Sequence, residues 1–492
     1  MSSTKSPHAL TIRAYQVGFG DCFLLSFHYE REDRHVLIDF GSTYKPKKLN
    51  IGLNQLMLDV ANDIARECKG KLHAVVATHR HRDHISGFTT GDDEQEAPGD
   101  IIARLEPDVV IQPWTEDPLA QPEATQPMRT LSSKKGFLAA LNDMHFIAGA
   151  AVREASQMKS FYKTNPELRF DVVKQIEFLG DDNKIANRSA IENLIRMSQR
   201  KGRAGSRDAR AFYVYHGSQS GLEDILPGVV TQVLGPPTLE QTDAIRQQRS
   251  RDENEYWHLQ ASAGRAVAGS RSKLFPFAAI HPESENPPPH TRWFIRHMQT
   301  VRANQLLGIV RELDSQLNNT SLILLFKVRG KKFLFPGDAQ IENWSYALFD
   351  APDSARTRRL LSRVNLYKVG HHGSLNATPR SLWALFENRS DKPTPQRLLT
   401  LISTMEDSPH GHKETKTEVP RRTLVAELRK ESEFFTTEQS DPDTHPPRKT
   451  IKINFRRAAT VKKTATAKKN ATVRKSVTAT KSATAKKSAK RR

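Results

Sequence analysis

Three histidines and one aspartate lie close together in the stretch THRHRDH at residues 78–84, namely His79, His81, Asp83 and His84. Neutral imidazole nitrogens and carboxylate oxygens suit Zn²⁺ first, with Mn²⁺ and Fe as the alternatives. The single residues between the ligands let alternate side chains face one way, while Asp83 and His84 turn towards a second ion. The spacing predicts a metal site; the alternative is a polar loop whose histidines only decorate the surface.

Strands and a helix must position that loop. Residues 72–77 form a short, mostly apolar run typical of a buried strand, so the cluster begins where a strand ends and side chains can converge on an ion. Residues 55–68 carry apolar side chains at helical spacing and predict the helix that leads into this strand. Alternating apolar residues predict the opening strands of a sandwich at 10–17, 22–27 and 35–42.

The middle of the chain also contains regular patterns. We expect helices at 131–155 and 187–199, and strands at 211–215 and 229–234 that both belong to the main sheet. Further apolar runs predict strands at 108–113, 318–326, 332–338, 398–403 and 449–455, and a short helix at 381–386.

Two glycine turns accompany the opening strands, VGFGD at 17–21 and LIDFG at 37–41. With the histidine cluster, they resemble the metallo-β-lactamase fold hydrolases. The resemblance is to the branch that contains the soluble domain of the competence DNA-uptake channel protein, a branch that is also similar to the phosphorylcholine esterases. Residues 318–338 match that branch's Asn-x-Ser strand and strand-Gly-Asp turn, and residues 365–374 match its last metal motif.

The resemblance covers roughly residues 10–115 and 318–430. It implies an α/β fold, the αββα metallo-β-lactamase sandwich, in which strand, helix, strand and ligand loop follow in this order. We therefore expect one hydrolase domain at residues 8–455, with a large insertion at roughly 116–317.

The resemblance also implies a site for two divalent ions. His79 and His81 would hold one ion, and Asp83 and His84 would hold the other. Asp338 would bridge both, because a bridging carboxylate neutralises charge between two cations.

Roles near the end of the chain follow from the same family pattern. His371 or His372 would complete the second ion's ligands, and its partner would contact the substrate or protonate the leaving group. A strand that ends on two adjacent histidines points them in opposite directions. We assign His372 to the metal, and His371, Asp83 and His410 to catalysis. His410 and His412 lie where the branch places a Gly-His-Pro turn, and a polar loop histidine is the alternative there.

One position departs from the family pattern. Family sites add a histidine after the strand at 108–113, where this chain has Trp114. His216 is a candidate replacement, although a polar residue at a strand end is the simpler interpretation. The remaining alternatives are a first ion that is weakly held and a centre that holds a single ion. Asp21 and Asp39 are expected to accept hydrogen bonds from metal-bound histidines, with turn formation as their alternative role.

Composition limits the class of protein. The chain has 492 residues, of which 37% are apolar, so it can build a substantial core. Cys22 and Cys68 are too few for a disulfide framework or a thiolate metal site, which agrees with a reducing cytoplasm. No apolar run approaches the ~18 residues of a membrane helix, and no signal-like core follows the N-terminus. We expect a soluble, cytoplasmic protein.

Positive charge is concentrated at the end of the chain. Of the 75 Lys and Arg residues, 14 lie at 456–492 with no Asp or Glu, so residues 1–455 carry 61 basic against 55 acidic side chains. The tail repeats Ala-Thr-Ala-Lys-Lys-like units without aromatic residues, and we expect it to be disordered. It resembles the arms of histone H1-like proteins, which implies nucleic-acid binding through phosphates and a nucleoid-associated location. Binding to anionic lipid is the alternative.

These features favour metal-activated hydrolysis, because the chain has neither a Gly-x-Ser-x-Gly elbow nor a Walker-type phosphate loop. Our leading hypothesis is a phosphodiesterase or nuclease that its basic tail tethers to DNA or RNA. The alternatives are a hydrolase of a small phosphodiester, phosphonate or lactone, and a catalytically inactive DNA-binding protein.

Overall fold

The computed structural model describes residues 6–92, 95–117, 187–202, 208–242, 318–374, 378–405 and 419–455. All of them belong to one unit, Met1–Phe455, and the second unit is Arg456–Arg492. The basic tail, the helix expected at 131–155, and His410 and His412 lie outside the described residues.

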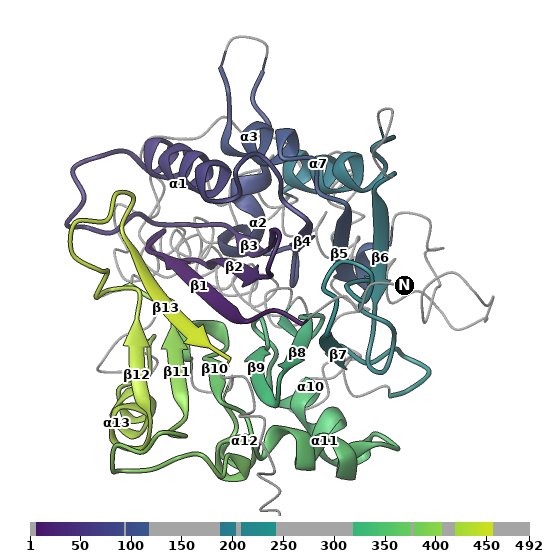
Figure 1. The fold of residues 1–492 in the computed structure, drawn as a ribbon, viewed down its shortest axis with the longest axis vertical. Coiled ribbons are helices and arrows are strands. Elements are labelled where there is room, and N and C mark those ends of the chain that lie inside the picture. The colour runs from purple at the N-terminus through teal and green to yellow at the C-terminus, as the bar shows by residue number, and fades with distance from the viewer. Residues whose placement is uncertain are drawn as a thin grey trace, which may run out of the picture. The chain divides into compact units, whose positions relative to one another are not determined.

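Seven strands form the first sheet: β1 (Ala9–Tyr15), β2 (Cys22–His28), β3 (Asp33–Phe40), β4 (Ala74–Val76), β5 (Val109–Pro113), β6 (Arg210–Val214) and β13 (Arg448–Asn454). Their order is β13-β1-β2-β3-β4-β5-β6 (Figure 1). The sheet is mixed, because pairing is antiparallel from β13 to β3 and parallel from β3 to β6. Each strand confirms a run that the apolar pattern predicted.

Six strands form the second sheet: β7 (Val229–Gly235), β8 (Ile323–Val328), β9 (Lys331–Phe335), β10 (Leu366–Lys368), β11 (Leu399–Ile402) and β12 (Glu433–Thr436). Their order is β12-β11-β10-β9-β8-β7, antiparallel from β7 to β9 and parallel from β9 to β12. The expectation that β6 and β7 share a sheet is wrong. β6 pairs with β5, whereas β7 pairs with β8.

The two sheets share one buried apolar core. Phe23 of β2 meets Phe335 of β9 with ring centroids 5.9 Å apart, and Phe27 meets Phe326 at 6.1 Å. Both pairs belong to a cluster of buried side chains drawn from the two sheets. The protein is therefore an α/β structure with two mixed sheets whose apolar side chains pack together.

Helices pack against each sheet through separate buried clusters. On the first sheet lie α1 (Leu53–Glu67), α3 (Pro98–Arg104) and α7 (Arg188–Ser198), drawn together at the top of Figure 1. On the second lie α10 (Ile341–Ser345), α11 (Ser354–Leu361), α12 (Arg380–Leu385) and α13 (Arg422–Glu431). In α1, Leu56, Val60 and Ile64 recur every four residues and are all buried, as the helical spacing predicted. No helix in the described ranges has the length and hydrophobicity needed to cross a membrane.

Candidate metal centre

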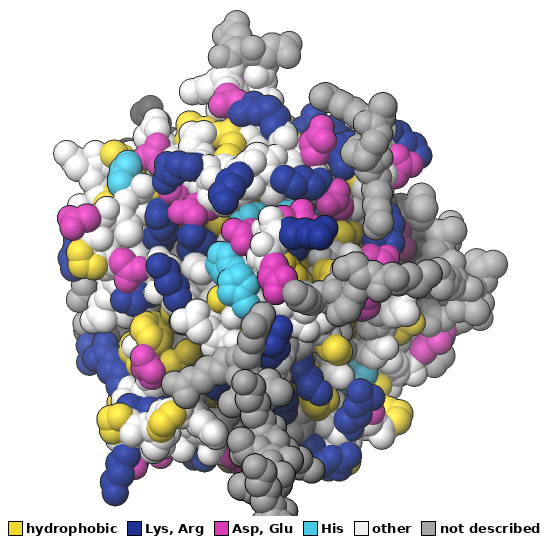
Figure 2. All heavy atoms as spheres, in the orientation of Figure 1, with side chains coloured by type: hydrophobic (Ala, Val, Ile, Leu, Met, Phe, Trp, Pro, Cys, Tyr) yellow, Lys and Arg dark blue, Asp and Glu magenta, His cyan; other side chains and the backbone are white. Residues whose placement is uncertain are grey.

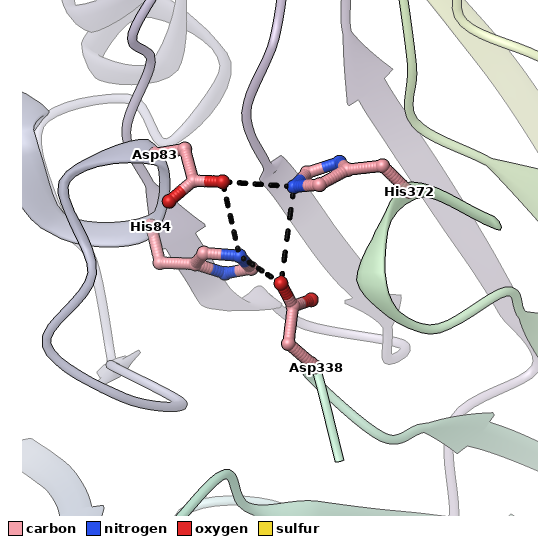
Figure 3. A group of neighbouring side chains, drawn as sticks. All are labelled: Asp83, His84, Asp338 and His372. Atoms are coloured by element: carbon pink, nitrogen blue, oxygen red, sulfur yellow. Dashed lines mark hydrogen bonds and ion pairs between the residues drawn. The ribbon is translucent and has the colours of Figure 1, made fainter. Parts of the chain in front are cut away.

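Four side chains converge where strands of both sheets end (Figure 3). Asp83 and His84 lie on the short helix α2 (Arg82–Ile85), which follows β4. Asp338 follows β9, and His372 lies in the short turn His371–Gly373 after β10. One ligand atom from each of the four lies within 4.8 Å of all the others, and all four side chains are buried. These residues form the candidate metal centre.

Nitrogen and oxygen atoms alternate around this group. Nε2 of His84 lies 3.0 Å from Oδ2 of Asp338, and Nε2 of His372 lies 3.0 Å from Oδ2 of Asp83. The remaining neighbours are 3.9 Å apart, from Nε2 of His84 to Asp83 and from Nε2 of His372 to Asp338. All four donor atoms therefore face a common point.

Hydrogen bonds on the opposite side of each imidazole fix its tautomer. Nδ1 of His84 lies 2.8 Å from Oδ2 of Asp39, and Nδ1 of His372 lies 3.0 Å from the carbonyl oxygen of Ser403. A carboxylate or carbonyl oxygen only accepts, so each Nδ1 carries the proton. In each ring Nε2 then faces a carboxylate, an arrangement that is favourable only when a proton or a metal ion lies between the two atoms. Oδ1 of Asp83 is also buried without a hydrogen bond in the described structure. This donor set fits a divalent cation.

The charges of the centre lead to the same conclusion. Burial alone would lower the pKa of His84, but the carboxylates of Asp338, Asp39 and Asp83 outweigh it and raise that pKa well above its ordinary value. Burial would likewise raise the pKa of Asp338, but the charges of His84, His371 and His372 and the hydrogen bond to His84 together outweigh it and hold that pKa well below its ordinary value. The negative potential of these carboxylates favours a proton on the imidazole, and it would equally favour a metal cation, which can replace that proton.

His79 and His81 lie beside this group but outside the set of four. Nε2 of His79 is 2.9 Å from Nδ1 of His81, and the His79 ring centroid is 4.2 Å from that of His84. Burial lowers the pKa of His81 to about 4, and burial followed by the charge of His84 lowers the pKa of His79 well below its ordinary value. These shifts favour the neutral imidazole at both positions, which is the form that binds metals.

The two adjacent histidines after β10 have different surroundings. Both have left-handed backbones, with φ of 44° at His371 and 49° at His372, a strained conformation that often occurs at functional sites. His372 enters the group of four, whereas His371 is only partly buried and donates its backbone N–H to Oδ1 of Asp338 at 3.0 Å. Burial lowers the pKa of the His371 imidazole.

The glycine turns bring their loops against α2. The backbone N–H of Asp21 donates to the carbonyl of Asp83 at 2.9 Å, and that of Gly41 donates to the carbonyl of Asp21 at 3.0 Å. A Cβ on Gly41 would lie 2.5 Å from the backbone nitrogen of His84, and one on Gly20 would lie 2.8 Å from the carbonyl oxygen of Asp83. Only glycine permits this approach, which explains why the motifs carry it.

Sequence reasoning missed Lys368, the last residue of β10. Its side chain is buried and its Nζ forms an ion pair with Asp21, lies 3.8 Å from Oδ1 of Asp338, and lies 3.4 Å from the carbonyl oxygen of Gly337. Burial would lower the pKa of Lys368, but Asp21 and Asp338 outweigh it and raise that pKa. The signal was a lysine in the otherwise apolar run LYKV, which a single glycine separates from the two histidines.

The position of the expected family histidine has another role here. Trp114 is fully buried and its Nε1 donates to the carbonyl of Pro237 at 3.1 Å. Nearby, Glu116 accepts three hydrogen bonds from Arg80, at 2.8, 2.9 and 2.6 Å. The candidate replacement His216 contacts the carbonyl of Leu234 and the carboxylate of Asp353. Neither Trp114 nor His216 belongs to the candidate ligand groups found among the described residues.

A comparison with models of known protein families gave no match, and a search of curated protein sequences also gave none.

Proposed function

We propose that this chain is a metal-dependent hydrolase of the metallo-β-lactamase type, with its two sheets as the inner layers of an αββα sandwich. One observation supports this most strongly. His84 and His372 donate outward through Nδ1, to Asp39 and Ser403, and direct their Nε2 atoms at the carboxylates of the centre. Two imidazole nitrogens and two carboxylate oxygens suit Zn²⁺, with Mn²⁺ and Fe as alternatives.

We assign a second ion to His79 and His81. Both are buried, and both have a lowered pKa. The His79 ring lies 4.2 Å from the ring of His84, whose Nε2 lies 3.0 Å from Oδ2 of Asp338. The resemblance in the sequence is what makes Asp338 the shared ligand. The fit of the donor atoms supports one ion directly, and the second ion follows from the family pattern.

The ions would supply Lewis-acid polarisation and a water molecule with a lowered pKa. The residues of the chain have other tasks. Asp39 and Ser403 keep the ligand imidazoles in one tautomer, and burial excludes bulk water from the donor atoms. His371, held against Asp338 through its backbone, would exchange a proton with the leaving group. His410 is the other candidate for that role.

The substrate class that we propose is the phosphodiester of DNA or RNA. The support for this class is the charge of the basic tail. On the face of the molecule shown in Figure 2, the visible Lys and Arg side chains are interleaved with Asp and Glu and form no continuous basic patch. The 14 basic residues of 456–492 are the stronger candidate for binding a polyanion. They would keep the catalytic unit on its polymer.

The test combines metal analysis with a substrate panel. Purified protein supplied with Zn²⁺ or Mn²⁺ is analysed for bound metal and incubated with single- and double-stranded DNA, with RNA, and with bis(p-nitrophenyl) phosphate. The Asp83→Ala/His84→Ala double variant should lose both metal and cleavage. A His445→Ala variant is the control, because His445 has a largely exposed side chain near Asp59 and belongs to neither of the candidate ligand groups.

Each outcome selects one function. Polymer cleavage that the double variant loses supports a metal-dependent nuclease. Cleavage of the small diester alone would redirect the proposal to a small-molecule hydrolase. Tight DNA binding without cleavage by metal-loaded protein would leave a DNA-binding protein with an inactive centre.

A further inference from the structure

We propose that Lys368 is a positioning residue of the candidate metal centre. Its ammonium group, anchored by Asp21, would hold one oxygen of Asp338 so that this carboxylate presents only its other oxygen to a metal ion. The inference rests on the metal site of the proposed function and specifies how Asp338 serves it.

Lys368 is too deeply buried to contact a substrate, and its ammonium group contacts residues of the chain instead. Its side chain is 2% exposed, and its Nζ faces acceptors of the site and of the loops that support it. These acceptors are the Asp21 carboxylate, Oδ1 of Asp338 at 3.8 Å, and the carbonyl oxygen of Gly337 at 3.4 Å. A buried ammonium surrounded in this way acts through the carboxylates that it contacts.

The two oxygens of Asp338 have different partners. Oδ1 accepts the backbone N–H of His371 at 3.0 Å and faces the Lys368 ammonium. Oδ2 faces Nε2 of His84 at 3.0 Å and Nε2 of His372 at 3.9 Å. Donors on the chain therefore already engage Oδ1, and only Oδ2 points at the imidazole nitrogens that would share an ion.

Asp21 is the acidic partner of Lys368. Its carboxylate lies 3.8 Å from Nδ1 of His84 and 3.6 Å from Nδ1 of His372, but those atoms donate at shorter distances to Asp39 and Ser403. The close partner of Asp21 is Lys368. Since the backbone N–H of Asp21 is bonded to Asp83, the ion pair links the lysine to the loop that carries two ligands.

Removing the ammonium should change the coordination of a bound metal. Without Lys368, Oδ1 of Asp338 loses its cationic neighbour and can turn towards the ion, so the carboxylate could bind through both oxygens. The coordination number would then rise by one. A purely structural role for the lysine would alter the stability of the protein but leave the ligand set unchanged.

The test uses the full-length chain with Co²⁺ as a spectroscopic probe. The Asp21→Asn/Lys368→Met variant removes both charges together, so that no buried charge is left without its partner. We expect weaker visible absorption of the Co²⁺ form, as the coordination number rises, and Co²⁺ affinity reduced about 10–100-fold in competition with a chelator. The control is Lys332→Met on the neighbouring strand β9, where Nζ donates to the carbonyl of Leu360 at 2.7 Å. It should change neither quantity.

A second measurement uses the wild-type protein, so it does not require that any variant folds. In a crystal structure of the Co²⁺-loaded wild-type protein, Oδ2 of Asp338 should bond to the ion while Oδ1 remains hydrogen bonded to His371. An ion bonded to both oxygens would overturn the inference alone. So would a folded Asp21→Asn/Lys368→Met variant with wild-type spectrum and affinity. Wild-type protein that binds no metal would overturn the proposed function together with this inference.

Discussion

Oδ2 of Asp39 lies 2.8 Å from Nδ1 of His84, and the same carboxylate accepts the backbone N–H and the hydroxyl of Thr78 at 2.7 and 2.8 Å. Asp39 therefore fixes a candidate ligand and the residue that precedes the histidine cluster at the same time. It does so from the end of β3, in a left-handed backbone with φ of 54°.

The Asp39→Asn variant tests this orienting role. Asn tolerates a left-handed backbone, so the turn should survive, but its single amide oxygen cannot replace both carboxylate oxygens, one of which accepts from the Thr78 N–H and the other from the Thr78 hydroxyl and Nδ1 of His84. We expect metal affinity to fall about 10–100-fold, measured by chelator competition, with an unchanged circular dichroism spectrum. Unchanged affinity would show that Asp39 only builds the turn.

The Gly41→Ala variant tests the close packing of the glycine turn on α2. A Cβ there would lie 2.5 Å from both the carbonyl carbon of Asp83 and the nitrogen of His84, and those backbone atoms cannot move without displacing the ligands. We expect the free energy of unfolding in urea to fall by about 1–3 kcal/mol. Gly52→Ala is the matched control, because nothing lies within 4 Å of a Cβ at Gly52. Equal effects from the two variants would contradict the packing argument.

A pH dependence follows from His73, away from the metal centre. The backbone N–H of His35 donates to Nδ1 of His73 at 3.1 Å, so this nitrogen is unprotonated, and burial lowers the pKa of His73 to about 3. Between that value and the ordinary 6.5, the unfolded chain binds the proton and the folded chain does not. Stability must therefore fall as the pH drops through this window.

The His73→Asn variant keeps an acceptor for the His35 N–H but cannot titrate. Its melting temperature should fall less than that of the wild type from about pH 7 to about pH 5. The two curves are compared by thermal unfolding in matched ionic strength. Parallel curves would mean that other groups govern the acid sensitivity of the fold.

Truncation after Phe455 tests the tail as the electrostatic tether. The wild-type chain should lose DNA affinity by about 10³-fold or more from about 50 mM to about 200 mM salt, as expected when many phosphate contacts release counterions. The truncated chain should bind more weakly and with a much shallower salt dependence in a fluorescence anisotropy titration. Turnover of bis(p-nitrophenyl) phosphate should stay the same in both, because the centre lies in the other unit. If truncation left the salt dependence of DNA affinity unchanged, the nucleic-acid contacts would lie within Met1–Phe455 instead.

Local patterns predicted a large part of this structure. The histidine cluster after β4, Asp338 after β9 and His372 after β10 each lie in a short contiguous motif at a strand end, and the resemblance of those motifs to a known family predicted that they share one site. The helix at 187–199 and the strands on either side were found in the same way, because their apolar spacing is a property of neighbouring residues.

Features that depend on distant segments were not predictable. The separation of β6 and β7 into different sheets is a matter of strand pairing, which apolar alternation does not encode. The carbonyl of Ser403 that orients His372 belongs to the backbone, so no residue type reveals it. The helices α3, α10, α11 and α13 and the strand β12 were also missed, since their short apolar stripes gain stability mainly from packing.

The centre takes Asp83 and His84 from the first sheet and Asp338 and His372 from the second. A chain whose two sheets have not yet docked has no complete set of candidate ligands, so tight capture of a metal ion would come after that docking. An ion bound there would cross-link segments that are far apart in sequence and should slow the separation of the two sheets during unfolding. Loss of the ion would then shorten the lifetime of the folded chain before it changed any secondary structure.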